Sequence, residues 1–187
     1  MNVVVRINRG GSRRISLRNR RFVDDPAVQH RFDRRQSQRT VGAGGERVIK
    51  AGDFFQGPLM TALAADEIIV EIRLPPWPAS RRWGFQEFAR RRGDFALAAA
   101  AVFYDLDDGG RARNAHVGVI GVADRPLRLP SVEAVMNSRV VDEAMIAKAD
   151  AAAAAAVDPD DDIHASGAYR KALVGTMVER ALKAAAR

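Results

Sequence analysis

The chain has 187 residues, with 30 basic and 23 acidic side chains and a net charge of +7 at neutral pH. This length allows one domain with a sizeable core, with or without an extension. Cysteine is absent, which excludes disulfides, a thiolate nucleophile and cysteine ligands to an iron–sulfur cluster within this chain. No apolar run reaches 18 residues and the apolar start is too short for a signal peptide, so we predict a cytoplasmic protein.

The positive charge is concentrated at the N-terminus. Residues 1–50 hold twelve Arg and one Lys against four acidic side chains, a net charge of +9, so the rest of the chain carries −2. Within 1–41 the apolar residues are too few to offset the entropy of ordering, and they follow no lasting period. We predict a basic, mostly disordered extension over 1–41 and a folded domain over 42–187. The extension lacks the interleaved aromatic residues of a single-strand binding platform, so nucleic-acid binding is not favoured.

The folded domain is predicted to begin with strands. Glycines at 42–45 precede an apolar pair at 48–49, which indicates a short hairpin. Over 67–74 the residues alternate between two faces, which is typical of a half-buried antiparallel strand. The face expected in the core consists of Ile68, Val70, Ile72 and Leu74.

Further strands are predicted over 83–88, 95–106 and 115–122. A turn over 90–94 joins the first two, and an Asp-Asp-Gly-Gly hairpin over 107–110 joins the second to the third. The sequence therefore predicts a small antiparallel sheet of three to four strands.

After Pro130 the pattern becomes helical. Ser131, Asp142 and Ser166 are the predicted N-caps of three helices. The last helix has an apolar stripe with a four-residue spacing, and its basic residues are expected to face outward or to lie near the C-terminal end. These are Arg170, Lys171, Arg180 and Lys183. A bundle of about three helices on one face of the sheet makes an α+β fold.

Metal and nucleophile motifs are not found. The acidic segment 158–162 is interrupted by Pro159 and has no bidentate Glu at the twelfth position of a calcium loop. His30, His116 and His164 are isolated from one another, so no metal site is predicted. No Ser/His/Asp arrangement or nucleophile elbow is present, so no catalytic residue is assigned.

The stretch from Trp83 to Val102 has the residue types of a binding surface. Aromatic residues are followed by three Arg at 90–92, by Gly93 and by small residues over 96–101. Rings, cationic donors and a closely approachable main chain suit a flat, anionic ligand. The same stretch also fits two core strands joined by a solvated basic turn, and the pattern alone leaves both interpretations open.

Four segments carry a resemblance to a known family. They are AGDFFQGPLMTALAADEIIVEIRLP, FQEFARRRGDFALAAAAV, HVGVIGVADRPLRL and DIHASGAYRKALVGTMVERAL, and they occur in order over about three quarters of the chain. From about Val48 onward the chain resembles the C-terminal domain of the FAD-binding medium subunit of the molybdenum hydroxylases, the family of xanthine dehydrogenase and carbon monoxide dehydrogenase. The resemblance implies a small antiparallel sheet packed by a helix bundle.

The resemblance also implies a role in electron transfer. In that family the domain closes over FAD, which receives electrons from the iron–sulfur clusters of a small subunit, supplied by a molybdenum site on a large subunit. It implies that Asp94 and Phe95 lie beside the isoalloxazine ring, and that Arg90 or Arg91 stabilises negative charge on the reduced ring. The implied partners are therefore the large and small subunits, with no membrane.

The sequence departs from the family upstream. The family's upstream domain holds the cofactor with an Ala-Gly-Gly phosphate loop and a Thr-Ile-Gly-Gly turn. This chain has no Thr-Ile-Gly-Gly, and its one Ala-Gly-Gly triplet, at 43–45, belongs to the glycine turn of the predicted hairpin, so we predict that the upstream domain is missing. We therefore expect weak or absent FAD binding by the chain alone and no turnover. Three hypotheses follow: a flavin-domain fragment completed by another chain or left as a truncated remnant, a non-catalytic interaction module, and a nucleic-acid binder that uses the Arg-rich extension.

Overall fold

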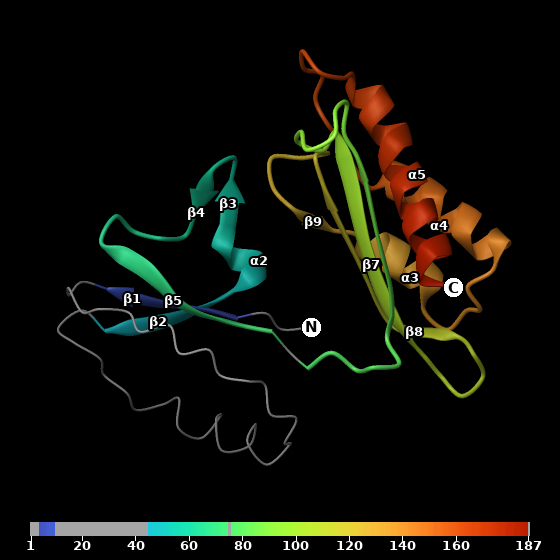
Figure 1. Cartoon of the computed structure of the whole chain (residues 1–187), viewed down its shortest axis with the longest axis horizontal. Helices are drawn as coiled ribbons and strands as arrows, with labels where there is room; N and C mark the ends of the chain where they lie inside the picture. Colours follow the sequence, from blue (N-terminus) through green and yellow to red (C-terminus); the bar gives the residue numbers. More distant parts are fainter. Residues whose placement is uncertain (1–3, 10–44, 75, 187) are drawn as a thin grey trace. The chain divides into compact units, whose positions relative to one another are not determined.

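A computed structural model describes residues 4–9, 45–74 and 76–186 of the chain. The chain divides into two compact units, Met1–Trp77 and Pro78–Arg187 (Figure 1). Each unit has its own sheet and its own apolar core.

The first unit is built on a three-stranded antiparallel sheet in the order β2-β1-β5. A two-stranded hairpin and one short helix follow β2. The elements are β1 (Val4–Arg9), β2 (Glu46–Lys50), α2 (Ala51–Phe54), β3 (Phe55–Gly57), β4 (Met60–Thr61) and β5 (Glu67–Arg73).

Strand β1 lies within the stretch that was predicted to be a basic, mostly disordered extension. Six residues of the basic extension form the central strand of this sheet, and Ile7 is fully buried. Its strand partners lie some forty and sixty residues further along the chain, so no local pattern announces the pairing. The rest of the predicted extension, from residue 10 to 41, lies outside the described residues.

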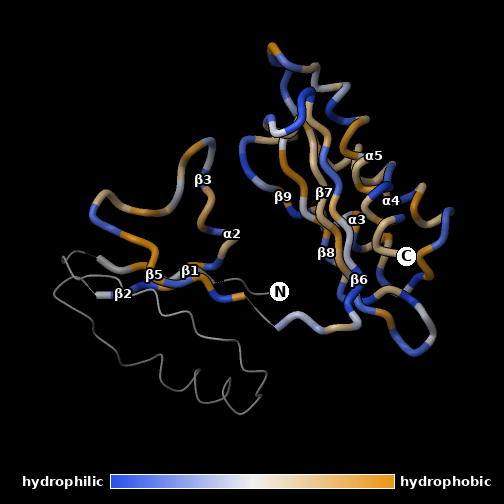
Figure 2. The backbone as a smooth tube through the Cα atoms, viewed as in Figure 1, coloured by the Kyte–Doolittle hydropathy of each residue, from blue (hydrophilic) through white to orange (hydrophobic). Residues whose placement is uncertain are grey.

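The covered face of β5 is the opposite of the predicted one. Ile68, Ile72 and Leu74 are 52%, 59% and 56% exposed, whereas Ile69 packs against the small core of Ile7 and Phe54. Figure 2 colours much of β5 as hydrophobic. Because apolar residues lie on both faces of the strand, their alternation alone did not show which face is covered. Of the charged residues on the covered side, Glu67 is accommodated because its carboxylate accepts two hydrogen bonds from Arg47, at 2.8 and 2.6 Å.

The second unit is a four-stranded antiparallel sheet in the order β6-β7-β8-β9, with three helices packed on one face (Figure 1). This arrangement confirms the predicted α+β class. It also shows that β5, which was expected in the same sheet, belongs to the other unit. The elements are β6 (Arg82–Phe88), β7 (Ala98–Leu106), β8 (Ala112–Ile120), β9 (Leu127–Arg128), α3 (Pro130–Met136), α4 (Glu143–Ala155) and α5 (Gly167–Ala185).

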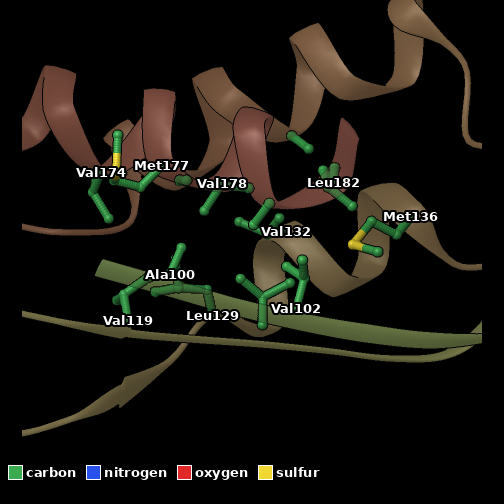
Figure 3. Packing of buried hydrophobic residues seen from close by; sticks show 14 of the residues in the cluster. Ala100, Val102, Val119, Leu129, Val132, Met136, Val174, Met177, Val178 and Leu182 are labelled. Carbon is green, nitrogen blue, oxygen red and sulfur yellow. The ribbon is translucent and has the colours of Figure 1, made fainter. Parts of the chain in front are cut away.

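The core lies between this sheet and its helices. Alternate residues are buried over 100–104 in β7 and over 115–119 in β8, which follows from the period of two along a strand, whereas the first three residues of β7 are all buried. Figure 3 shows Ala100, Val102 and Val119 of the sheet pointing toward Val174 and Val178 of α5. Because the side chains on β7 are small, the helices approach the strands closely.

The closest approach occurs at Gly84 in β6. A Cβ built on this glycine would lie 2.0 Å from the main-chain oxygen of Ala181 in α5 and 2.9 Å from its carbonyl carbon. The strand and the helix therefore contact each other backbone to backbone, which only glycine permits.

Two of the three predicted helix caps are confirmed. The side chain of Asp142 accepts a hydrogen bond from the Met145 N–H, and that of Ser166 accepts one from the Tyr169 N–H. The third prediction was wrong, because α3 begins at Pro130 with Leu129 as its N-cap and no side-chain cap. Proline at the first helical position has no N–H that needs a partner, and the helix starts two residues earlier than an N-cap at Ser131 would place it.

Candidate functional site

The loop of residues 89–97 joins the end of β6 to the start of β7 and carries every predicted site residue. Arg90, Arg91, Asp94 and Phe95 are all exposed, and Phe95 is 94% exposed. The structure therefore brings these four residues together on one short surface loop. The interpretation of this turn as a solvated surface segment also holds, since its side chains are not part of the core.

The loop is shaped by its own main chain. The Asp94 N–H donates to the Arg91 carbonyl at 3.2 Å, which closes a turn whose Gly93 has φ of +82°. This angle falls in the region that favours glycine, as predicted. The Asp94 carboxylate then accepts the Phe95 N–H at 2.9 Å. The turn thus aims an aromatic ring and several guanidinium groups outward from a fixed corner.

The chemistry of this loop suits a planar ligand that carries negative charge. The exposed ring of Phe95 offers an apolar face for stacking, and the guanidinium groups of Arg90 and Arg91 offer donors for an anionic edge. Asp94 has a structural part in this arrangement, because its carboxylate already accepts a main-chain N–H within the loop.

The base of the loop is held by Arg170 of α5. Arg170 was expected to face outward from the last helix, but its side chain is only 9% exposed. Its Nη1 atom donates to the carbonyl oxygens of Leu97, at 3.1 Å, and of Gly121, at 2.7 Å. Its Nη2 atom donates to Asp162 at 2.5 Å.

The acidic segment before α5 organises the start of that helix. Asp162 also accepts the N–H groups of His164 and Ala165 at 2.8 and 2.9 Å. The hydrogen bond from Arg170, followed by those main-chain donors, holds the pKa of Asp162 well below its usual range. Asp161 accepts the Gly167 N–H at 2.6 Å. A local signal for this role existed in the spacing of these carboxylates ahead of a helix start.

A buried carboxylate, that of Glu133, joins α3 to the sheet. Glu133 accepts the Val117 N–H at 3.0 Å and two hydrogen bonds from Arg128, at 2.7 and 2.8 Å. Burial opposes the negative charge, yet the bonds from Arg128 and Val117 outweigh it, so the pKa of Glu133 is lowered. This group lies on β8, β9 and α3 and does not touch the 89–97 loop.

The described residues contain neither the side-chain grouping of a metal site nor a helix suited to span a membrane. Among residues 4–9, 45–74 and 76–186, no three His, Asp or Glu side chains are grouped so that they would hold a metal ion. No helix within that part of the chain has the length and apolar character needed to cross a bilayer.

The sequence matches a family of flavoproteins. Residues 83–185 match the family described as the CO dehydrogenase flavoprotein C-terminal domain. The medium subunit of nicotine 6-hydroxylase from Paenarthrobacter nicotinovorans is 39% identical over 138 residues, which cover 74% of this chain and 48% of that protein.

Solved structures give the same relationship. Carbon monoxide dehydrogenase of Hydrogenophaga pseudoflava, in a form that lacks the Mo-pyranopterin moiety, superposes with a TM-score of 0.71 at 34% identity, over 77% of this chain and 50% of that one. Quinoline 2-oxidoreductase of Pseudomonas putida 86 superposes with a TM-score of 0.73 at 27% identity, over 99% of this chain and 53% of that one. The chain thus spans about half the length of the relatives it matches.

The family match covers more than half of the chain and contains β6, the 89–97 loop, the rest of the sheet and nearly all of the helix bundle. The resemblance noted in the sequence is therefore confirmed, and the chain belongs to the CO dehydrogenase flavoprotein C-terminal domain family.

Proposed function

We propose that this chain is part of the FAD-binding medium subunit of a molybdenum hydroxylase and that its 89–97 loop covers the isoalloxazine ring. The bound flavin would accept electrons from iron–sulfur clusters of a partner subunit and deliver them to an acceptor. The observation that carries the proposal is the exposed corner of Arg90, Arg91 and Phe95 within a domain of a flavoprotein family.

Each residue of the loop has a defined task in this proposal. Phe95 stacks against the flat ring and shields one face from water. Arg90 or Arg91 donates hydrogen bonds to the part of the ring that becomes negative on reduction. Asp94 holds the corner through the Phe95 N–H, as it already does at 2.9 Å. The residues present thus fit the ring portion of the cofactor.

The pyrophosphate portion requires another part of the protein. The relatives are about twice the length that this chain covers. This sequence has no Thr-Ile-Gly-Gly turn, and its one Ala-Gly-Gly triplet, at 43–45, directly precedes β2 in the sequence. We therefore propose weak FAD binding by the chain alone, and assembly with an upstream flavin-binding segment, a molybdenum-binding large subunit and an iron–sulfur small subunit. A cytoplasmic location and the absence of turnover in isolation stay predictions.

The test is a titration of FAD with the full chain, followed by flavin fluorescence. We expect quenching by the wild type, and Phe95→Ala should weaken the affinity about three- to tenfold because a stacking contact is lost. Val140→Ala is the matched control, since Val140 is 52% exposed and lies at the opposite end of the sheet, next to the β7–β8 hairpin. Unchanged affinity and reduction rate in Phe95→Ala would contradict the proposal.

A second candidate function is that of a colourless interaction module. The sheet face turned away from the helices exposes Trp83, Phe85 and Ile120 by 62%, 50% and 44%. Exposed apolar residues grouped on a sheet suit contact with another protein surface. Here the proposed occupant is the portion of a medium subunit that this chain does not span. Co-purification with that portion without any flavin absorbance would favour this candidate over the first.

The nucleic-acid hypothesis depends on the Arg-rich segment of residues 10–41, which lies outside the described residues. It stays a prediction, testable as a salt-dependent shift with DNA that disappears when residues 10–40 are deleted, which keeps β1 in the chain.

A further inference from the structure

Arg170 occupies an unusual position for a basic residue. It lies in the first turn of α5, whose N-cap is Ser166, and the partial positive charge of a helix N-terminus disfavours cations there. It is also buried, with 8% of the residue exposed, which is costly for a charged side chain unless its donors are satisfied. The structure supplies three partners for its Nη1 and Nη2 atoms, whereas its buried Nε has no hydrogen-bond partner among the described residues.

The partners join distant parts of the chain at one point. The two carbonyls come from Leu97, at the exit of the 89–97 loop, and from Gly121, just after β8. Both acceptors lie close together because Gly121 has φ of +81° and no side chain, and a Cβ there would lie 2.7 Å from the Leu97 oxygen. The carbonyl oxygens of Leu97 and Gly121 both carry partial negative charge. Arg170 therefore holds their two main-chain segments together by donating to both oxygens.

Leu97 is held from both sides. Its N–H donates to the Phe88 carbonyl at 2.8 Å, which ties the exit of the loop to its entrance at the end of β6. Its carbonyl accepts a hydrogen bond from Arg170, which ties the next peptide group, between Leu97 and Ala98, to α5. Phe95 lies two residues upstream with an almost fully exposed ring, so its direction depends on the path that the main chain takes into Leu97.

The guanidinium is itself fixed by one carboxylate. Asp162 accepts from Nη2 of Arg170 and from two main-chain N–H groups, so it cannot rotate away without losing all three bonds. The chain of contacts runs from the acidic segment through Arg170 to the loop.

We infer that Arg170 is a positioning residue that fixes the main-chain path of the 89–97 loop and thereby the direction of Phe95. The consequence for flavin binding rests on the function proposed above, whereas the positioning of the loop does not. A planar guanidinium is suited to this task because it reaches two carbonyls and a carboxylate at the same time.

The first experiment is amide hydrogen exchange on the full chain, without flavin. In Arg170→Met, exchange in a peptide spanning 94–98 should be faster by about a factor of ten, the expected result of losing hydrogen bonds to a charged donor. Exchange in the middle of α5 should stay unchanged. Arg170→Lys keeps the charge but lacks the forked guanidinium, so its exchange rate at 94–98 should lie between those of the wild type and Arg170→Met. Asp162→Asn should have an exchange rate at 94–98 similar to that of Arg170→Lys.

Glu133→Gln is the matched control. It disrupts an equally buried ion pair between a helix and the sheet, where the Glu133 side chain is 7% exposed, but it does not touch the loop. Its exchange at 94–98 should match the wild type. If Arg170→Met does not fold, the comparison of Arg170→Lys with Glu133→Gln decides. Equal exchange at 94–98 in the folded Arg170 variants and the wild type would overturn the inference, as would an equal increase in Glu133→Gln.

The second experiment separates this inference from the proposed function. FAD affinity is measured in Arg170→Lys, in Phe95→Ala and in the double variant. If the loop positions the ring for the flavin, the double variant binds no more weakly than Phe95→Ala alone. Should Phe95→Ala bind FAD like the wild type, the proposed function fails, and the exchange result still decides whether Arg170 positions the loop.

Discussion

At the scale of single residues, the second unit leaves no space between β6 and α5. Because the main chains touch at Gly84, even a methyl group must displace the helix or the strand. The residue also alternates with the exposed Trp83 and Phe85, so β6 turns one apolar face outward and one closely packed face inward.

Gly84→Ala should lower the free energy of unfolding by about 2–3 kcal/mol because the added methyl overpacks the interface. Chemical unfolding followed by circular dichroism at the helix band measures this, since the longer helices all lie in the second unit. Gly118→Ala is the control: its Cβ would be 3.8 Å from the nearest atom outside its neighbours, the Leu127 oxygen, so we expect a change within about 0.5 kcal/mol. Equal effects of the two substitutions would refute this account.

Residue types and spacing predicted the exposed corner of the site but not its support. Gly93 marks the turn and the arginines precede it, so a local pattern sufficed for the exposed turn, whereas the candidate roles of Asp94 and Phe95 beside the flavin came from the family resemblance. Arg170 was missed because its partners at Leu97 and Gly121 are 73 and 49 residues away. A helical period assigns a basic residue to the solvent side, and only tertiary contacts override that assignment.

At the scale of elements, helix starts were the best predicted feature, since a cap acts within three residues. Asp142 shows this for α4, where its carboxylate accepts the Met145 N–H at 2.8 Å. The same local logic failed for β5, because two apolar faces compete and the face that is covered depends on Ile7, which comes from far upstream.

Asp142→Ala should destabilise the second unit by about 1 kcal/mol, because the first turn of α4 loses the acceptor for a main-chain N–H. Thermal unfolding at neutral pH is the measurement. The same change at Asp108, an exposed residue of the β7–β8 turn, should have an effect within about 0.5 kcal/mol. An Asp142→Ala midpoint that matches that of Asp108→Ala would show that the cap contributes nothing.

At the scale of the whole molecule, acid stability depends on a few paired carboxylates. The pKa of Glu133 is lowered in the folded state, and so are those of Asp105, through its hydrogen bond from Arg81, and Asp162. A group with a lowered pKa stabilises the fold at pH values above its unfolded pKa, and this contribution disappears as the pH falls through the folded pKa. Asp150 has the opposite sign, because burial, followed by the charge of Glu179, raises its pKa.

The fall in unfolding free energy between neutral pH and about pH 3.5 should therefore be smaller in Glu133→Gln than in the wild type. Below the unfolded value of 4.5 the unfolded wild type takes up a proton at Glu133 while the folded state still resists it, which favours unfolding, whereas the variant has no such group. Denaturant unfolding of both proteins across this range is the measurement. If the unfolding free energies of the two proteins fall in parallel with pH, Glu133 does not contribute to the acid sensitivity.

The predicted boundary at residue 42 rests on composition, whereas the boundary between the two units rests on contacts within the structure. Composition marks where the Arg-rich stretch gives way to ordinary sequence, whereas the structural division falls between Trp77 and Pro78. The α+β class was predictable because the strands, turns and helices of the second unit follow in order along 82–185 and pair with near neighbours.

The buried cluster of the second unit begins at Leu97 and ends at Ala185, so every large side chain that holds it together comes from one continuous stretch of chain. A fusion, an insertion or a change of frame ahead of residue 78 would replace none of these side chains. Among the described residues, the apolar core of the second unit therefore needs no side chain from the first.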